Sequence, residues 1–409
     1  MYKFFNLNNY RDSNYTLILI AMVLCFSSFQ TILTPSIDYI ALNIKNNNHM
    51  FYSYATIASL VATIPQASAL ISGYVVNNLL YRKAISIVFG VIVILSGLIL
   101  LNHKDFGMYV IFVIISGVLS VALYCNIDRQ IVILLKDKIR DFQNDSFIWG
   151  SILAIINLKF SNWLFVHYSL SGIISYNLLL NTLAFICLYR IPAVDKIASD
   201  DNHHDKLPNL VLLIKTFLNH PKLLIFWGVL LVIMFTSSGF TILLTTKIHH
   251  EGIPNSVWSS NMALMAFGNL LGAVLCKTSH IKSFNSIKVI CFSEIMYGLS
   301  LILLTFTHQV NFIFMLTWFL GFINPFILIN MNTLFARYIS NNEDLVRISP
   351  VVNGALTSGF YIVCLIGPLL INFFLQVNIS YVTLFIIIGI MEVLLSITLI
   401  NIKNLRHLI

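Results

Sequence analysis

Charge is scarce in this sequence. Lys, Arg, Asp and Glu make up 10% of the 409 residues, whereas a soluble domain typically contains about 25%. Hydrophobic residues make up 58%. This composition excludes an ordinary soluble protein and predicts an integral membrane protein. The first apolar run is long enough to span a membrane, so we expect no cleavable signal peptide.

Signatures of enzymes and ATP-driven pumps are also absent. The sequence has no glycine-rich loop of the Walker type, no H-E-x-x-H and no G-x-S-x-G. Its six cysteines lack the C-x-x-C spacing of metal sites and are interpreted as small apolar residues. The histidines lack ligand spacing as well. We therefore expect no enzyme activity, no cofactor and no metal.

One polar stretch divides the chain near its middle, from Arg190 to Lys222. Residues 195–206 carry too little apolar surface to offset the entropy lost on ordering, which is typical of a solvated linker. Apolar residues then recur at helical spacing from Leu210 to Leu218. This pattern predicts either a helix in the membrane interface or a soluble linker helix.

Apolar runs of about 20 residues, long enough to cross the hydrocarbon, occur on both sides of this linker. Six precede it: Tyr15–Ile37, Phe51–Val76, Ala84–Leu101, Phe106–Cys125, Ser146–Val166 and Ser169–Tyr189. Six follow it: Leu223–Leu244, Asn255–Leu275, Ile287–Phe306, Asn311–Ala336, Ile348–Leu375 and Tyr381–Ile402. The prediction is an all-α integral membrane protein with two six-helix bundles, residues 1–190 and 223–409, joined by linker 191–222.

The basic residues test this count. With the N-terminus in the cytoplasm, twenty of the 24 Lys and Arg residues fall in inside segments. Only Lys45, Lys104 and Lys247 fall in outside loops, and Lys159 lies within a span. This alternation follows the positive-inside rule and predicts both termini in the cytoplasm. It also explains the net charge of +8 without a nucleic-acid partner.

The two halves resemble each other. The first span contains S-S-F-Q-T-I-L-T from Ser27, the seventh contains S-S-G-F-T-I-L-L from Ser237, and five of eight positions match. The second span ends with Gly73 four residues before Asn77, and the eighth ends with Gly272 four residues before Cys276. These matches favour a duplicated six-helix unit.

The loop after the second span carries a motif. It reads G-Y-V-V-N-N-L-L-Y-R-K, from Gly73 to Lys83. With twelve spans, a central linker and related halves, it resembles the G-x-x-x-D-R-x-G-R-K loop of the major facilitator superfamily. The sequence departs from that motif, because Asn77 replaces the acid and Leu80 replaces the second glycine. No glycine occurs between Ser151 and Ser171, so the antiporter subgroup is not established.

The resemblance implies inner gating residues. The candidates are Gly73, Asn77 and Arg82 in this loop, together with Asp128, Arg129 and Arg337 at inner helix ends. Alternatively, Arg82 only marks the inside loop as a basic residue, and Asp128 and Arg129 form an ordinary charge pair at the membrane interface.

The resemblance also places the first, fourth, seventh and tenth spans around a central cavity. Their polar residues recur on single helix faces. The resulting substrate-binding candidates are Gln30, Thr34, Ser120, Tyr124, Thr241, Trp318 and Asn324, with Asn157 added from the fifth span. Ordinary helix packing is the alternative, since Ser and Thr are common at membrane helix interfaces.

Three ionisable residues lie well inside spans and are candidates for coupling: Lys159, Glu294 and Glu392. Lys159 would attract an anionic solute or exchange a proton, or would instead reach toward the outer interface. The two glutamates would titrate during transport, or would be structural, because the resemblance puts the ninth and twelfth spans at the periphery.

The sequence therefore predicts a secondary transporter of a small organic solute that works by alternating access. We expect proton-coupled export as a monomer across a bacterial cytoplasmic membrane. Two alternatives stay open: uptake of a nutrient or anionic metabolite by proton symport, and a non-transporting receptor or assembly protein that keeps the fold.

Overall fold

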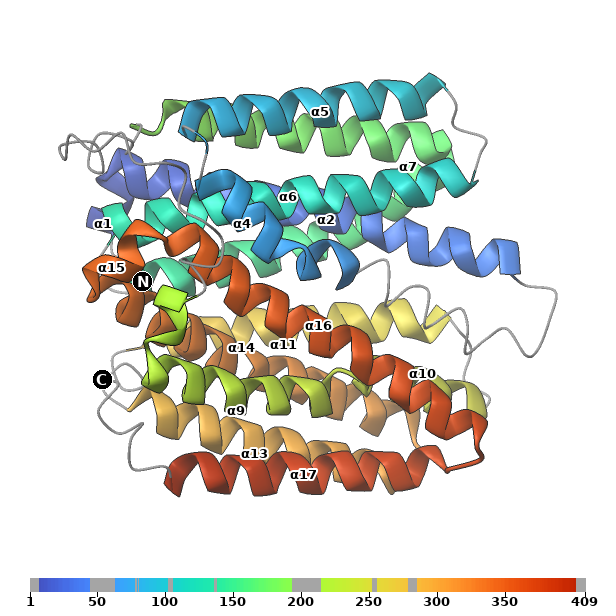
Figure 1. The fold of residues 1–409 in the computed structure, drawn as a ribbon. Coiled ribbons are helices and arrows are strands. Elements are labelled where there is room, and N and C mark those ends of the chain that lie inside the picture. The colour runs from blue at the N-terminus through green and yellow to red at the C-terminus, as the bar shows by residue number, and fades with distance from the viewer. Residues whose placement is uncertain are drawn as a thin grey trace.

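The computed structural model describes residues 7–44, 63–77, 79, 81–101, 106–135, 138–192, 215–251, 256–278 and 285–401, and the elements in these ranges are helices (Figure 1). The first half contains α1 (Leu7–Arg11), α2 (Ser13–Ile44), α4 (Ala69–Asn77), α5 (Tyr81–Leu101), α6 (Phe106–Leu134) and α7 (Ile139–Arg190). The second half contains α9 (Pro221–Ser237), α10 (Phe240–His250), α11 (Ser256–Cys276), α13 (Ser286–Thr305), α14 (Val310–Ser340), α15 (Glu343–Arg347), α16 (Ser349–Gln376) and α17 (Tyr381–Asn401).

The all-helical prediction is confirmed. Seven helical segments in the described ranges are long and apolar enough to cross a membrane, and three shorter helices are apolar as well.

The starts of two helices follow from local chemistry. Pro221 occupies the first turn of α9, where its missing N–H costs nothing. The Asn285 side chain accepts hydrogen bonds from the N–H groups of Ile287 and Lys288 and so caps α13.

The fifth and sixth predicted spans are joined without a loop. Both lie in α7, and the chain turns at Ser169, whose φ is 53° and ψ is −150°. The two parts then run back along each other, since the Tyr176 hydroxyl donates to Asn157 Oδ1 at 2.9 Å. Helical periodicity continues up to the turn on both sides, so hydropathy alone does not show how short it is.

The seventh predicted span, Leu223–Leu244, is not one continuous helix. It divides into α9 and α10 at Ser238 and Gly239. This break packs closely on α16. A Cβ added at Gly239 would lie 1.5 Å from Ile371 Cδ1, and one added at Gly367 would lie 1.8 Å from Ser238 Oγ. Glycine suits both positions because a Cβ there would collide with the Ile371 or the Ser238 side chain.

Buried apolar side chains form two large clusters. One draws on residues 15–191, and the other draws on residues 217–399 together with Val132. The predicted linker lies mostly outside the described residues, but residues 215–218 are helical. Phe217 of that turn is buried, with its ring 5.8 Å from the Trp227 ring. The end of the linker is therefore packed onto the second cluster.

A packing prediction follows from α11 and α14, which approach through glycines. A Cβ added at Gly321 would lie 2.2 Å from the Met265 carbonyl oxygen, whereas one added at Gly97 would meet nothing within 4 Å. We expect Gly321→Ala to lower the free energy of unfolding by about 1–3 kcal/mol, as overpacked cores do. Gly97→Ala, the matched control, should leave it unchanged or raise it, because alanine favours the helix. Thermal unfolding of the purified protein measures both, and equal unfolding temperatures would contradict this close approach.

Candidate functional site

The two halves meet closely at the end of the molecule that carries α1 and α15 (Figure 1). We call this the inner end, after the side that the basic residues predict to be cytoplasmic, and we call the opposite end the outer end. There, α4 packs on α16. A Cβ at Gly73 would lie 2.1 Å from the Pro350 carbonyl oxygen, and one at Gly354 would lie 2.4 Å from that of Ala69. Ser358 Oγ accepts from the Leu70 N–H at 2.6 Å and donates to the Ala67 carbonyl at 2.8 Å.

An ion pair joins α7 to the end of α11 in the same region. Lys277 Nζ contacts the Asp145 carboxylate, and the two side chains are only 4% and 1% exposed. The Tyr15 hydroxyl donates to the other carboxylate oxygen at 2.6 Å. Four apolar residues form a cluster beside the pair: Ile148, Ala273, Cys276 and Ile329. A buried charge without a partner is costly, so each member of the pair needs the other. We call these contacts, together with the α4–α16 packing, the inner seam.

The predicted gating residues only partly coincide with the inner seam. Gly73 lies in it. Arg82 lies over the Tyr189 ring, 5.2 Å from its centroid, within the first half. Asp128 is half-buried, and Arg337 is exposed and interacts with the like charge of Arg140. Arg129, next in the chain, is half-buried as well. The Asn77 side chain lies outside the described residues.

Sequence reasoning missed Asp145 and Lys277. Lys277 was counted among the inside basic residues, and Asp145 stands directly before a predicted span. An acidic residue directly before one span and a basic residue directly after another could have indicated an ion pair. Their separation of 132 positions along the chain hides the pairing.

Asn157 belongs to a polar network inside the first half. Its Nδ2 donates to the carbonyl and the hydroxyl of Ser27, and its Oδ1 accepts from Tyr176. Nearby, Asn177 Nδ2 donates to the Ser28 carbonyl at 2.7 Å. These contacts tie α2 to both parts of α7, which favours a packing role for Asn157.

The other cavity candidates are dispersed. Ser120 is buried and donates to the Ser116 carbonyl of its own helix at 2.9 Å. Tyr124 is half-buried beside the first apolar cluster. Asn324 donates to Asn269 Oδ1 at 3.2 Å, and the Trp318 ring stacks on Phe322 at 5.6 Å. The side chains of Gln30, Thr34 and Thr241 lie outside the described residues.

Lys159 lies on the stripe of α7 that meets the second half. Ile148 and Ile152 pack against α11 residues nearer the inner end, and Lys159 follows Ile152 by two helical turns. Its side chain is exposed, and it has no ion pair or hydrogen bond within the described ranges. No protein group in these ranges therefore compensates the charge of the ammonium group.

The two membrane glutamates come together within the second half. Glu294 of α13 is 3% exposed and Glu392 of α17 is 0% exposed. The Thr236 hydroxyl of α9 lies 2.5 Å from Glu392 Oε1. Neither glutamate has an ion pair within the described residues.

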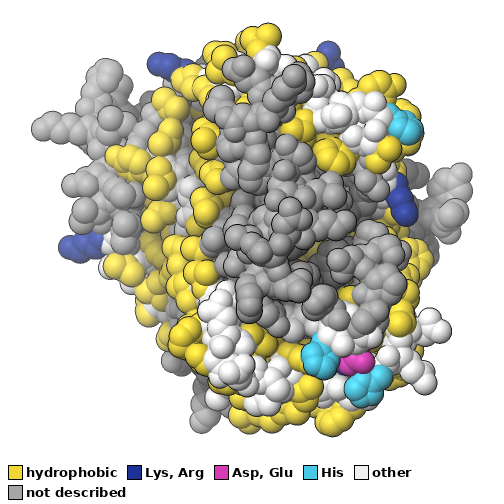
Figure 2. All heavy atoms as spheres, turned by 90° about the vertical axis from the view of Figure 1, so that its right-hand side faces the viewer, with side chains coloured by type: hydrophobic (Ala, Val, Ile, Leu, Met, Phe, Trp, Pro, Cys, Tyr) yellow, Lys and Arg dark blue, Asp and Glu magenta, His cyan; other side chains and the backbone are white. Residues whose placement is uncertain are grey.

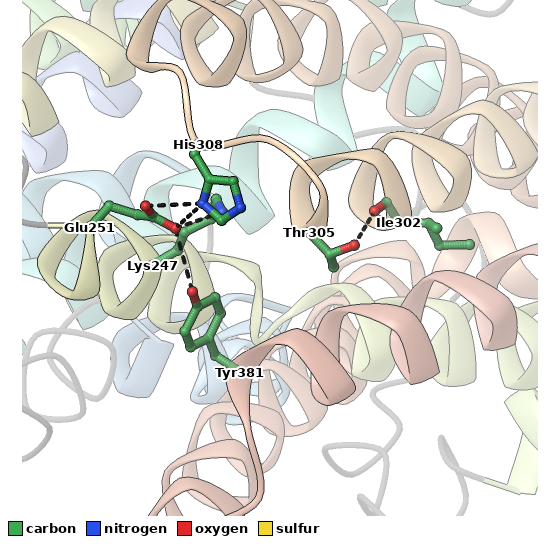
Figure 3. Close-up of polar contacts among 6 residues, drawn as sticks. All are labelled: Lys247, Glu251, Ile302, Thr305, His308 and Tyr381. Atoms are coloured by element: carbon green, nitrogen blue, oxygen red, sulfur yellow. Dashed lines mark hydrogen bonds and ion pairs between the residues drawn. The ribbon is translucent and has the colours of Figure 1, made fainter.

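A separate cluster lies at the outer end of the second half (Figure 3). Lys247, which the sequence placed in an outside loop, is instead a fully buried residue of α10. Its Nζ lies 3.4 Å from Glu251, whose carboxylate also contacts His308 Nδ1 at 2.9 Å and Tyr381 at 3.5 Å. Partial burial raises the pKa of Glu251, but the His308 hydrogen bond and the Lys247 charge outweigh it and leave that pKa below its ordinary value. Figure 2 views this end and shows acidic and histidine side chains gathered at one edge, with apolar side chains around the rim.

Comparison with known proteins decides the family. The model of the MFS_1 like family matches residues 15–340, which is most of the chain. The chain belongs to this family. It is thus a multi-pass membrane protein with a major facilitator fold.

Solved structures agree on the fold. The human organic anion transporter MFSD10 (TETRAN) superposes with a TM-score of 0.70 at 11% identity, over 95% of this chain and 99% of that one. A mutant of the nucleoside transporter NupG superposes with a TM-score of 0.64 at 13% identity, over 95% of this chain and 99% of that one. No curated protein sequence matches the chain.

Labelling of native cysteines can test whether the ion pair holds the inner seam closed. Cys276 is 1% exposed beside Lys277, and Cys291 is 0% exposed in the second apolar cluster. Removing one member of a buried ion pair costs about 3–5 kcal/mol. We therefore expect Lys277→Gln and Asp145→Asn to open the inner seam and to raise maleimide modification of Cys276 at least about tenfold, which needs only about 1.4 kcal/mol.

The readout is mass spectrometry of the Cys276 peptide, with Cys291 as the internal control for unfolding. Lys288→Gln changes an exposed lysine and should not alter labelling. Exchanging the two residues, Asp145→Lys with Lys277→Asp, should restore protection. Unchanged Cys276 labelling in both single variants would show that the pair does not hold the inner seam.

Proposed function

We propose that this protein is a secondary active transporter of a small organic solute and works by alternating access. The observation that carries the proposal is the inner seam, in which a buried ion pair and glycine-to-backbone contacts join the two halves of a major facilitator fold. Such contacts are either made together or lost together, so the inner seam is suited to two discrete states. Closed and open forms of it would expose a central site to opposite sides of the membrane in turn.

The position and charge of Lys159 favour an anionic solute. It lies within a span, its ammonium group has no protein partner in the described ranges, and it follows the α7 stripe toward the second half. A lysine at membrane depth is costly unless water or an anion compensates its charge. A carboxylate or other acidic group on the solute would supply that compensation.

We further propose that export is driven by proton exchange, that the protein acts as a monomer, and that it resides in a bacterial cytoplasmic membrane with both termini inside. Uptake with a proton is the second candidate, because an exposed lysine serves an anionic metabolite equally well in either direction. The sign of proton movement distinguishes the two.

The deciding experiment is solute-dependent proton flux in sealed vesicles that contain the purified protein. An imposed pH gradient is monitored while pools of organic anions and nucleosides are added. Dissipation that requires the protein and one pool supports coupled transport, and its direction separates export from uptake. A folded protein that moves neither protons nor any solute would favour the non-transporting alternative.

A variant tests the role of Lys159. We expect Lys159→Ala to lower the rate of anion transport at least about tenfold, because a charge-assisted hydrogen bond contributes about 1.5–3 kcal/mol. Lys159→Arg keeps the charge and should retain a measurable part of the rate. The exposed inner-end residue Lys83 provides the control, since Lys83→Ala also removes one positive charge. Unaltered transport by Lys159→Ala would remove this residue from the solute site.

A further inference from the structure

Two glutamates occupy the middle of neighbouring helices at the edge of the second half. Glu294 lies about 12 Å along α13 from its start, and Glu392 lies about 17 Å along α17, at 1.5 Å per residue. Both are therefore near the centre of helices long enough to span a membrane. A carboxylate at that depth is costly, so its presence needs a reason beyond packing.

The two side chains face each other. Helices α13 and α17 approach through Gly298 and Gly389, and a Cβ at Gly298 would lie 3.0 Å from Glu392 Cβ. Glu294 precedes Gly298 by one turn and so points from the same face. The two carboxyl groups interact electrostatically. Because two like charges cannot both persist in apolar surroundings, this pair holds at least one proton.

No positive charge compensates the pair within the described residues. The titratable groups that face it are Cys291 and Tyr297 from α13, with Cys364 of α16 beside Tyr297. Helix α9 contributes only the Thr236 hydroxyl, and α10 contributes Phe240 against the Tyr297 ring. The nearest lysine of α10, Lys247, is engaged by Glu251 at the outer end.

The hydrogen-bond geometry at Thr236 is consistent with a proton on Glu392. Thr236 Oγ1 lies 2.5 Å from Glu392 Oε1 and 2.7 Å from the Ile233 carbonyl oxygen. A hydroxyl has one hydrogen and can donate to only one of these acceptors. Both contacts are hydrogen bonds only if Glu392 carries a proton and donates it to Thr236, which then donates to Ile233. The other oxygen of Glu392 is buried without a partner in the described ranges, which leaves the ionised form poorly solvated.

We propose that Glu294 and Glu392 form a proton-binding site outside the central cavity, and that its proton controls the junction between α9 and α10 through Thr236. This inference rests on the proposed transport function. One proton bonds to a carboxylate oxygen of the pair and later leaves the same oxygen, and no other covalent bond changes. When it leaves, the Thr236 hydroxyl must turn from Ile233 toward the Glu392 carboxylate, because a charged acceptor is the stronger one.

The position of Thr236 connects this proton to a larger motion. Thr236 lies three residues before Gly239, where α9 gives way to α10. That junction packs against Ile371 and Gly367 of α16, the helix that also forms the inner seam. A change in the Thr236 hydrogen bond therefore acts where one helix part can tilt against the other.

Infrared difference spectroscopy tests the proton site without any solute. Purified wild-type protein in lipid is titrated with acid and base, and the C=O stretching band of protonated carboxyl groups is recorded. We expect a band typical of a carboxyl in dry surroundings, reduced in both Glu294→Gln and Glu392→Gln. Glu343→Gln, which removes an exposed acid at the inner end, should leave it unchanged. A band equally strong in both pair variants, or one that responds to sodium rather than to pH, would overturn the proposal.

Transport by the same variants tests control of the junction. In vesicles that respond to a solute pool, Glu392→Gln and Thr236→Val should keep solute exchange at equal pH but lose accumulation driven by a pH gradient. Ser300→Ala, which removes a hydroxyl bonded within α13, is the matched control and should keep both activities. Gradient-driven accumulation that is unaltered in Glu392→Gln and Thr236→Val would overturn the proposal. Failure of the wild type to exchange any solute would instead refute the proposed function, and the infrared result would still stand.

Discussion

The buried ion pair between Asp145 and Lys277 is the contact on which the closed inner end depends. It connects α7 of the first half to the end of α11 in the second, in a cluster of apolar side chains. Neither charge is stable there alone, so partial separation is unfavourable. The glycine contacts between α4 and α16 add a steric requirement, because backbones that fit closely cannot slide gradually past each other. Together they favour a seam that is fully closed or fully open.

One buried polar cluster in each half shows a different way of satisfying polar groups. In the first half, the amide of Asn157 and the hydroxyls of Ser27 and Tyr176 satisfy one another. In the second half, the partner that we propose for Glu294 and Glu392 is a proton rather than a protein cation. Polar groups in a membrane interior must find partners within the protein. On this proposal the Asn157 network is fixed, whereas the partner of the two glutamates is exchangeable.

Hydropathy and the distribution of basic residues were enough to predict the helical architecture. The bilayer sets the length of each span, and it biases Lys and Arg toward the loops on the inner side. Breaks inside spans were not predictable in this way. The junction at Ser238 and Gly239 depends on contacts with α16, and the turn at Ser169 depends on a single backbone conformation. The site was predicted less well than the fold. Glu294 and Glu392 were recognised singly, but their adjacency and the Asp145–Lys277 pairing arise only from tertiary packing.

The turn at Ser169 has a practical consequence. Two spans follow each other there with no intervening loop, and Tyr176 hydrogen-bonds back to Asn157. Only a short exposed stretch, residues 166–169, is available at this point for a protease to cleave or for an antibody to bind. An epitope tag inserted between His167 and Leu170 would separate the two arms of α7. Mapping of the outer surface by tag insertion should therefore avoid this turn.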